Sequence, residues 1–354
     1  MISSVALVLE LLMPQDFNQE GIQTLELIQR EFRPKDSPHY LENTGPGAKK
    51  EVLFNWGVGV LISAMNGAAK ADPKWRKTLR DTIESTRAYW NPAKPVPGYD
   101  VWPMPKPADR YYDDNAWMVL ALVEASDILS EPKFLDYAKE TLTFVLSGED
   151  EKLGGGIYWR ENEKMSKNTC SNGPSAAACL AVYERTKDRR LLDKAIALYD
   201  WTRRNLQDPA GKLFWDSISL SGKIDKTKWS YNTALMIRTA AELGRITGKE
   251  TYREEAKAMA AASEAKWLVN GRFADEGKFA HLLLESWTYV PNKERMKRAS
   301  QAMKWLITNA KNEQGFYGHR FDVPSNPKQE QFALIDQASA ARAFFIVGQA
   351  IGQN

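Results

Sequence analysis

The feature that most constrains the fold is a repeated pattern of short polar breaks and helical segments. Breaks begin at residues 71, 130, 186 and 247, about sixty residues apart, and a similar one begins at 291. That spacing leaves room for two helices and a loop between successive breaks. Amphipathic segments with one charged face follow the breaks at residues 134–146, 191–206, 252–268 and 295–308. Segments rich in apolar and small residues precede them at residues 54–69, 116–129, 175–185 and 233–246.

The two kinds of helix predict two layers. Helices that are apolar nearly all round belong inside a protein, and helices with one charged face belong outside. Counting residues 17–32 as the first outer helix and 332–351 as the last inner one gives about six hairpins. We find no strand-helix alternation of the kind a parallel sheet needs. We therefore predict an all-α (α/α)6 toroid of six helical hairpins, forming a single domain over residues 1–354; an open solenoid with polar capping helices is the alternative.

Charge and composition narrow the class of partner. The 48 basic and 45 acidic residues are interspersed, and no basic run resembles a nucleic-acid footprint, so we expect no nucleic-acid partner. Cys170 and Cys179 form no CxxC motif. His39, His281 and His319 lie far apart and lack the spacing of metal ligands, so we expect neither a metal nor a cofactor. We also expect a monomer.

The two cysteines and the first residues of the chain are informative about the cellular compartment. No segment approaches the length of a membrane-spanning helix, so no membrane partner is expected. Residues 1–13 are apolar, but no Lys or Arg precedes them and Glu10 interrupts them, which makes a poor signal peptide. Two unpaired cysteines favour a reducing compartment. We expect a cytoplasmic protein; secretion, with a signal peptide already removed, is the alternative.

Asp113 and Asp114 lie side by side where an aromatic loop turns into an apolar helix, in the run Tyr111-Tyr112-Asp113-Asp114-Asn115-Ala116-Trp117. Two carboxyls among aromatic rings suit acid/base or nucleophilic chemistry on a sugar. A structural interpretation is also open, because Asp is a favoured helix cap and acidic residues stabilise a first turn. Capping explains one aspartate more easily than two adjacent ones.

Topology predicts where such residues gather. In alternating antiparallel helices, all inner helices begin at one face of the ring, and the loops that enter them are rich in aromatic residues, glycine and amides. The opposite connections are short and charged. Asn172 and Asn232 are also good helix caps, which remains an alternative role for them. On the predicted face we expect substrate contacts from Trp56, Trp102, Tyr112, Trp159, Asn172, Tyr231, Asn232 and His319.

Four segments together resemble one family. They are Tyr112-Asp113-Asp114-Asn115-Ala116-Trp117, Gly155-Gly156-Ile157-Tyr158-Trp159, Ser171-Asn172-Gly173 and Ser230-Tyr231-Asn232. Their order and spacing resemble glycoside hydrolase family 76, the α-1,6-mannanases and their relatives, over roughly residues 54–287. The resemblance implies an (α/α)6 toroid, an oligo- or polysaccharide substrate, and cleavage of α-1,6-linked mannose-type glycans, with transglycosylation as a further reaction.

The resemblance also implies roles for the two aspartates. Asp113 would be the nucleophile and Asp114 the general acid/base of a retaining double displacement. We expect the helix dipole to favour ionised Asp113, and the negative charge of Asp113 to raise the pKa of Asp114.

Other readings of the same residues remain open. Sugar epimerases and unsaturated glucuronyl hydrolases resemble this architecture, although the epimerases rely on paired histidines that three scattered ones do not obviously supply. A glycan-binding protein without catalytic activity is a further alternative.

Overall fold

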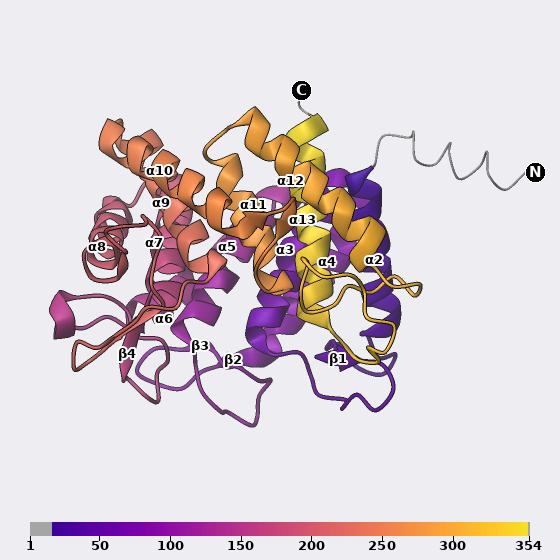
Figure 1. The fold of residues 1–354 in the computed structure, drawn as a ribbon. Helices are drawn as coiled ribbons and strands as arrows, with labels where there is room; N and C mark the ends of the chain where they lie inside the picture. Colours follow the sequence, from indigo (N-terminus) through magenta and orange to yellow (C-terminus); the bar gives the residue numbers. More distant parts are fainter. Residues whose placement is uncertain (1–15, 353–354) are drawn as a thin grey trace, which may run out of the picture.

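The computed structural model describes residues 16–352, which form two concentric sets of helices (Figure 1). Along the sequence, each outer helix is followed by an inner helix. The outer helices are α2 (Phe17–Glu31), α4 (Arg76–Ser85), α6 (Pro132–Leu146), α8 (Arg189–Leu206), α10 (Glu250–Trp267) and α12 (Lys293–Trp305). The inner helices are α3 (Asn55–Ala71), α5 (Tyr112–Leu129), α7 (Thr169–Thr186), α9 (Ser230–Thr247), α11 (Ala280–Thr288) and α13 (Leu334–Gly352).

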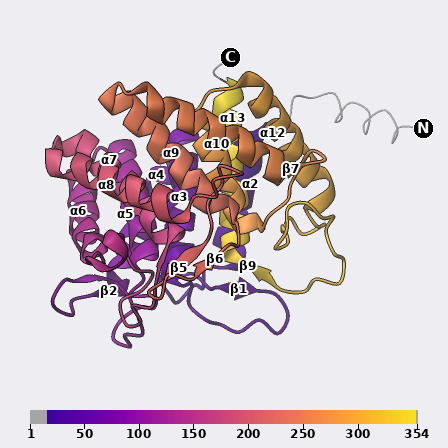
Figure 2. The same ribbon diagram turned by 60° about the vertical axis from the view of Figure 1, so that its left-hand side comes forward.

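The inner helices form a closed ring. Each packs on the next along the chain, and α13 packs back on α3. The contact between the last and the first inner helix confirms a toroid and excludes the open solenoid. The sixth hairpin pairs α13 with α2, so it joins helices from opposite ends of the described chain (Figure 2).

Burial follows the sequence pattern of each helix. In α7 every residue from 169 to 182 is buried, as its small apolar side chains require in an inner position. In α8 the buried residues recur at helical spacing, among them Leu192, Ala195 and Tyr199, while the other face carries charges. The ring closes around Phe345, whose side chain lies against Gly21 of α2 and Gly67 of α3.

Short antiparallel strands tie the loops together, several of them along the lower edge of Figure 1. In the three-stranded sheet, Lys167 lies opposite Ile218, which lies opposite Ile224. The pairs are β1 (Asn43–Thr44) with β9 (Phe332–Ala333), β2 (Trp90–Asn91) with β3 (Gly98–Tyr99), and β7 (Leu268–Val269) with β8 (Arg272–Phe273); the sheet joins β4 (Ser166–Asn168), β5 (Ser217–Ser219) and β6 (Ile224–Asp225).

Three inner helices begin earlier than the sequence pattern predicted. Helix α5 begins at residue 112 rather than 116, α7 at 169 rather than 175, and α9 at 230 rather than 233. The capping role considered for Asn172 and Asn232 is therefore wrong, because both lie inside a first turn. The residues at the cap positions, Tyr111, Asn168 and Trp229, make no side-chain capping bond. Asp113 and Asp114 consequently belong to the first turn of α5.

Candidate active site

Asp113 is held by hydrogen-bond donors from two other segments. One oxygen, Oδ2, accepts a hydrogen bond from the indole Nε1 of Trp159 at 3.1 Å. The Cys170 thiol on α7 and the backbone N–H of Asp114 also act on this carboxyl and lower its pKa. Burial raises the pKa of Asp113 to about 6, and these donors oppose the rise because they stabilise the charged form. At neutral pH the group is therefore mostly ionised.

Asp114 has a different environment from its neighbour. Its side chain is buried, with 8% of the residue surface exposed. Burial raises its pKa well above the usual range, and the negative charge of Asp113 raises it further. Within residues 16–352, no side chain donates a hydrogen bond to its carboxyl. The pair therefore combines two carboxyls of different pKa, the lower at Asp113 and the higher at Asp114, which is the combination that acid/base and nucleophilic chemistry requires.

Two exposed indole rings lie on the face where the inner helices begin. Trp159, which bonds to Asp113, is 38% exposed and packs edge-on against Tyr111 at 5.2 Å between ring centroids. Trp102, in the loop whose Val101 carbonyl accepts from the first residue of α3, is 37% exposed and packs against Phe54 at 6.5 Å. Most large hydrophobic side chains of the described chain are buried, so exposed indoles on this face offer stacking surfaces for a sugar ring.

A row of packed aromatic rings connects α3 with α9. Trp56 stacks on Phe279 at 5.9 Å, and Phe279 stacks on Tyr231 at 4.3 Å. Cys170 on α7 lies beside both Tyr231 and Asp113, and it raises the pKa of the Tyr231 hydroxyl and lowers that of the Asp113 carboxyl. Trp56 and Tyr231, both predicted substrate contacts, are thereby joined to the aspartate pair through one connected set of side chains.

His319 belongs to a group of charged side chains beside Trp56. Its Nε2 lies 3.3 Å from Glu276 and its Nδ1 lies 3.6 Å from Asp336, in the first turn of α13. The bond to Asp336 raises the pKa of His319. Lys278 pairs with Glu276 at 2.5 Å, and its Nζ lies 5.7 Å from the ring of Trp56. The structure therefore places His319 on the predicted face, with acidic partners that the sequence had not assigned to it.

Asn232 also contacts an acidic residue that the sequence analysis missed. Its amide Nδ2 donates to Oδ1 of Asp216 at 3.3 Å, and burial raises the pKa of Asp216. Asp216 lies close enough to Cys170 and Tyr231 for its negative charge to raise the pKa of both groups. The signal available in the sequence was its place in the aromatic run Phe214-Trp215-Asp216.

Buried polar atoms without partners concentrate on this face. Within residues 16–352, the buried polar atoms without a hydrogen-bond partner include one in the first turn of each of five inner helices. Such atoms are rare in native proteins, and their concentration in one place indicates a polar ligand. They are Trp56 Nε1, Asp113 Oδ1, Ser171 Oγ, Asn232 Oδ1 and Asp336 Oδ1, with Ser230 Oγ beside them on α9.

Two predicted contacts do not reach this face. Tyr112 is 1% exposed and stacks on Phe144 at 5.0 Å, so its ring packs inward against α6. Asn172 has no exposed surface: its Oδ1 accepts from the N–H of Ile157, and its Nδ2 donates to the carbonyls of Ile157 and Asn168. A side chain with neither exposed surface nor a spare polar atom cannot contact a sugar, so the structure does not support these two assignments.

A large cavity and the carboxyl pair lie at different places. The cavity, of about 930 Å³, is lined by later turns of the inner helices and includes neither Asp113 nor Asp114. We assign the site from the paired carboxyls and their surroundings, because the chemistry requires them and the cavity offers no such pair. Within the described residues, no group of three His, Cys, Asp or Glu side chains could hold a metal ion, and no helix is long and apolar enough to cross a membrane.

Comparison with known proteins agrees with the fold. A GH76 α-mannanase from Bacteroides thetaiotaomicron, BT2949, superposes with a TM-score of 0.89 at 31% identity, covering 96% of this chain and 98% of the other. The GH76A α-1,6-mannanase from Salegentibacter sp. HEL1_6 superposes with a TM-score of 0.82 at 19% identity, covering 95% of this chain and all of the other.

A curated fungal relative gives a shorter match. Mannan endo-1,6-alpha-mannosidase DCW1 from Candida glabrata is 27% identical over 182 residues, which are 46% of this chain and 40% of the relative. The chain thus spans less than half the length of that protein. The model of glycosyl hydrolase family 76 matches residues 35–276. With most of its length matched by that model, the chain belongs to glycosyl hydrolase family 76.

Proposed function

We propose that the protein hydrolyses α-1,6-linked mannose-type glycans with retention of anomeric configuration. The observation that carries this proposal is the asymmetric pair in the first turn of α5. Asp113 is ionised and bonded by Trp159 and Cys170, whereas Asp114 is buried beside it with a raised pKa. An ionised carboxyl and a protonated one, side by side, supply the nucleophile and the acid of such a reaction.

The proposed reaction has two steps. In the first, Asp113 attacks the anomeric carbon while Asp114 gives its proton to the glycosidic oxygen, which leaves as a hydroxyl and produces a covalent glycosyl-enzyme. In the second, ionised Asp114 removes a proton from water, the water attacks the anomeric carbon, and Asp113 is released as a carboxylate. A sugar hydroxyl in place of water would give transglycosylation by the same route.

The choice of substrate rests on relatives. An inactive variant of the Salegentibacter enzyme, with two consecutive aspartates changed to asparagine, has been solved in complex with α-1,6-mannotriose. The fungal relative carries the name of a mannan endo-1,6-α-mannosidase. The exposed rings of Trp102 and Trp159 and the unpaired polar atoms of the inner-helix first turns suit an oligosaccharide, which presents both apolar faces and hydroxyls.

The test is a panel of α-1,6-, α-1,2- and α-1,3-linked manno-oligosaccharides, with products identified by mass and the first-formed anomer by NMR. Cleavage confined to α-1,6 linkages, with the α-anomer formed first, supports the proposal. A β-anomer as the first product would exclude the double displacement. Binding without any product over long incubation would favour a glycan-binding protein.

A further inference from the structure

The cavity described above occupies the end of the ring opposite the aspartate pair. Its volume is about 930 Å³, within the range of small-molecule sites. It begins one helical turn beyond the site residues: Trp117 follows Asp113 by four positions on α5, and Leu235 follows Tyr231 by four on α9, and both line the cavity. Its opposite end is bordered by the first turns of α12 and the last turns of α13.

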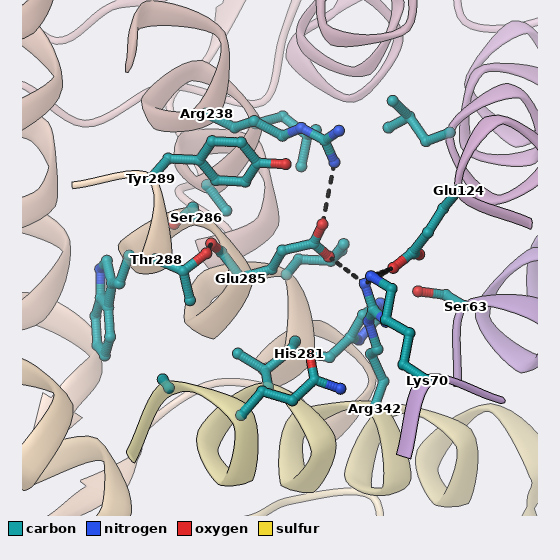
Figure 3. Close-up of a pocket in the computed structure, with 18 of the residues that line it drawn as sticks. Ser63, Lys70, Glu124, Arg238, His281, Glu285, Ser286, Thr288, Tyr289 and Arg342 are labelled. Atoms are coloured by element: carbon teal, nitrogen blue, oxygen red, sulfur yellow. Dashed lines mark hydrogen bonds and ion pairs between the residues drawn. The ribbon is translucent and has the colours of Figure 1, made fainter. Parts of the chain in front are cut away.

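Ion pairs from five inner helices surround this cavity (Figure 3). Lys70 pairs with Glu124 at 2.6 Å, and Arg342 pairs with Glu124 at 3.0 Å. Glu285 then links the two arginines, lying 3.6 Å from Arg342 and 3.1 Å from Arg238. The remaining walls are mostly apolar and include Trp117, Leu120, Ile128, Leu235, Leu282 and Trp287.

The lining has an excess of positive charge. It contains six basic residues, Lys70, Arg185, Arg238, Lys293, Lys297 and Arg342, but only three acidic ones, Glu124, Asp127 and Glu285. Burial lowers the pKa of His281 to about 3, so this lining histidine is neutral. The lining therefore carries three more positive than negative charges. Glu242 and Glu184, outside the lining, pair with Arg238 and Arg185 and offset part of this excess, and the remainder favours an anion.

One of the two central arginines also has a buried donor without a partner. The Arg342 side chain is 6% exposed and its Nε has no hydrogen-bond partner within the described residues. The Nε of Arg238, whose side chain is 15% exposed, lies 3.5 Å from a carboxyl oxygen of Glu242 and is paired with it. A buried donor without a partner carries a desolvation cost that a ligand oxygen would remove.

Stabilisation of the helices does not account for this charge. Lys70 and Arg185 lie in last turns, where a helix dipole favours cations. Arg238 and Arg342, in contrast, lie in the middle of α9 and α13, and Lys293 is the first residue of α12, where the dipole disfavours a cation. Replacing buried ion pairs by apolar residues is often neutral or stabilising, so packing alone does not require them.

We propose that this cavity is a second binding site, independent of the hydrolase site, for a small organic anion. The ligand carries a carboxylate or phosphate group, which Arg238 and Arg342 bind, and its body lies against the apolar wall at Trp117 and Leu235. Lys293 and Lys297 lie at the border of the cavity and attract the anion. The proposal does not depend on the reaction catalysed at Asp113 and Asp114.

Isothermal titration calorimetry tests the proposal with gluconate as the carboxylate probe, glucose 6-phosphate as the phosphate probe, and glucose as the neutral control. We expect at least one anion to bind, with an affinity that falls as salt is added, and glucose not to bind at the same concentration. Absence of binding by both anions, or equal binding of glucose, would overturn the proposal.

The location of the anion site in this cavity is tested with variants of exposed lysines, which preserve the fold. Lys293→Gln/Lys297→Gln removes two exposed charges at the border and is expected to weaken anion binding about 3- to 10-fold. Lys304→Gln, an exposed lysine of α12 outside the cavity, is the matched control and should bind as the unchanged protein does. Equal affinity in all three proteins contradicts the assignment.

Independence from the hydrolase site is tested in the inactive Asp113→Asn/Asp114→Asn protein. We expect the anion to bind equally well with and without saturating α-1,6-mannotriose. Competition between the two ligands would place the anion at the first turn of α5 and overturn the proposal. Failure of the mannotriose itself to bind would count against the proposed function and leave the anion titration as an independent measurement.

Discussion

Two adjacent residues of the same type differ in chemistry here because their neighbours differ. Asp113 receives an indole N–H, a thiol and a backbone N–H, all of which favour its charged form, and Asp114 receives none of these. Their positions in a first turn also expose both to the positive end of the dipole of α5. In the proposed mechanism, the division of roles between nucleophile and acid therefore follows from the side chains of Trp159 and Cys170, which lie beside the pair.

Substitution of Asp114 separates the two roles. Asp114→Asn removes the acid, so kcat/KM on α-1,6-mannotriose should fall about 10²- to 10⁴-fold. An aryl mannoside with a very acidic leaving group needs no proton, so its glycosylation step, measured as a burst of released phenol, should persist. Asp113→Asn should abolish the burst as well. Asp127→Asn, at the far end of α5, serves as the control and should retain activity.

The bond from Trp159 to Asp113 should be visible in the pH profile. Because the N–H stabilises the carboxylate, Trp159→Phe should raise the pKa of Asp113 and move the acidic limb of kcat/KM upward from about 6, by up to about one pH unit. The loss of the indole also affects KM, so the limb is the diagnostic quantity. Cys170→Ala should move the limb in the same direction, and an unchanged limb in both variants would exclude these donors as stabilisers of Asp113.

Asp114 should also reduce stability at high pH. A carboxyl whose folded pKa is raised favours the unfolded chain once it ionises there, so the penalty is absent below the unfolded pKa and grows as pH rises above it. Asp114→Asn has no charge to bury. Its melting temperature should therefore exceed that of the unchanged protein by more at about pH 8 than at about pH 4. A constant difference across this range would mean that burial does not raise the pKa.

At the scale of elements, three inner helices use an amide side chain to hold the loop that precedes them. Asn115 on α5 accepts from the N–H of Tyr99 and donates to its carbonyl. Asn172 on α7 does the same to Ile157, and Gln337 on α13 to Tyr317. Each amide bonds to both the N–H and the C=O of one residue, as a neighbouring β-strand would. For Asn172 that residue is Ile157, two positions before Trp159, so the amide also helps to fix the loop that carries Trp159.

Removal of one of these amides should lower the free energy of unfolding. Asn172→Ala removes three buried hydrogen bonds and leaves the peptide N–H and C=O of Ile157 without these partners, so the free energy of unfolding should fall by about 2–4 kcal/mol in urea titration. Asn162→Ala, at an exposed position in the same loop, should change it by less than about 0.5 kcal/mol. Equal effects of the two substitutions would contradict a structural role for Asn172.

These elements also explain which site residues the sequence could predict. The positions of the helices follow from apolar periodicity, and the importance of Asp113, Trp159 and Tyr231 follows from their place in aromatic loops. The direction in which each side chain points could not be predicted from the sequence. Helices α5 and α7 begin four and six residues before their apolar patterns, so residues expected in loops lie on helix faces. That earlier start rotates Tyr112 toward Phe144 and Asn172 toward the preceding loop.

At the scale of the molecule, the toroid was predictable because two kinds of helix alternate along the chain. The contacts between loops were not, since β1 and β9 pair residues 43–44 with residues 332–333, and no local pattern links segments so far apart. Acidic partners such as Asp216 and Asp336 lie on different helices or loops from the residues that they contact, so they emerged only from the folded ring.

Closure of the ring depends on a close approach between α3 and α13. A Cβ at Gly67 would lie 2.7 Å from the ring of Phe345, which is fully buried, so Gly67→Ala should destabilise the protein by about 1–3 kcal/mol. Gly59 lies on the same helix, where a Cβ would meet its nearest neighbour at 3.8 Å. Gly59→Ala should be neutral or stabilising by up to about 1 kcal/mol, because Ala favours a helix. Denaturant unfolding of both variants compares the two glycines, and similar losses would exclude Phe345 as the cause.

The pairing of α2 with α13 has a consequence for synthesis. Helix α2 leaves the ribosome first among the described helices, but its main partner is the last of them to be made. Until then the growing chain is an open arc whose two ends present apolar surface to the cytosol or to a translocation machinery. Chaperones and aggregation therefore compete with closure during that interval, and the ring can close only after release of its final helix.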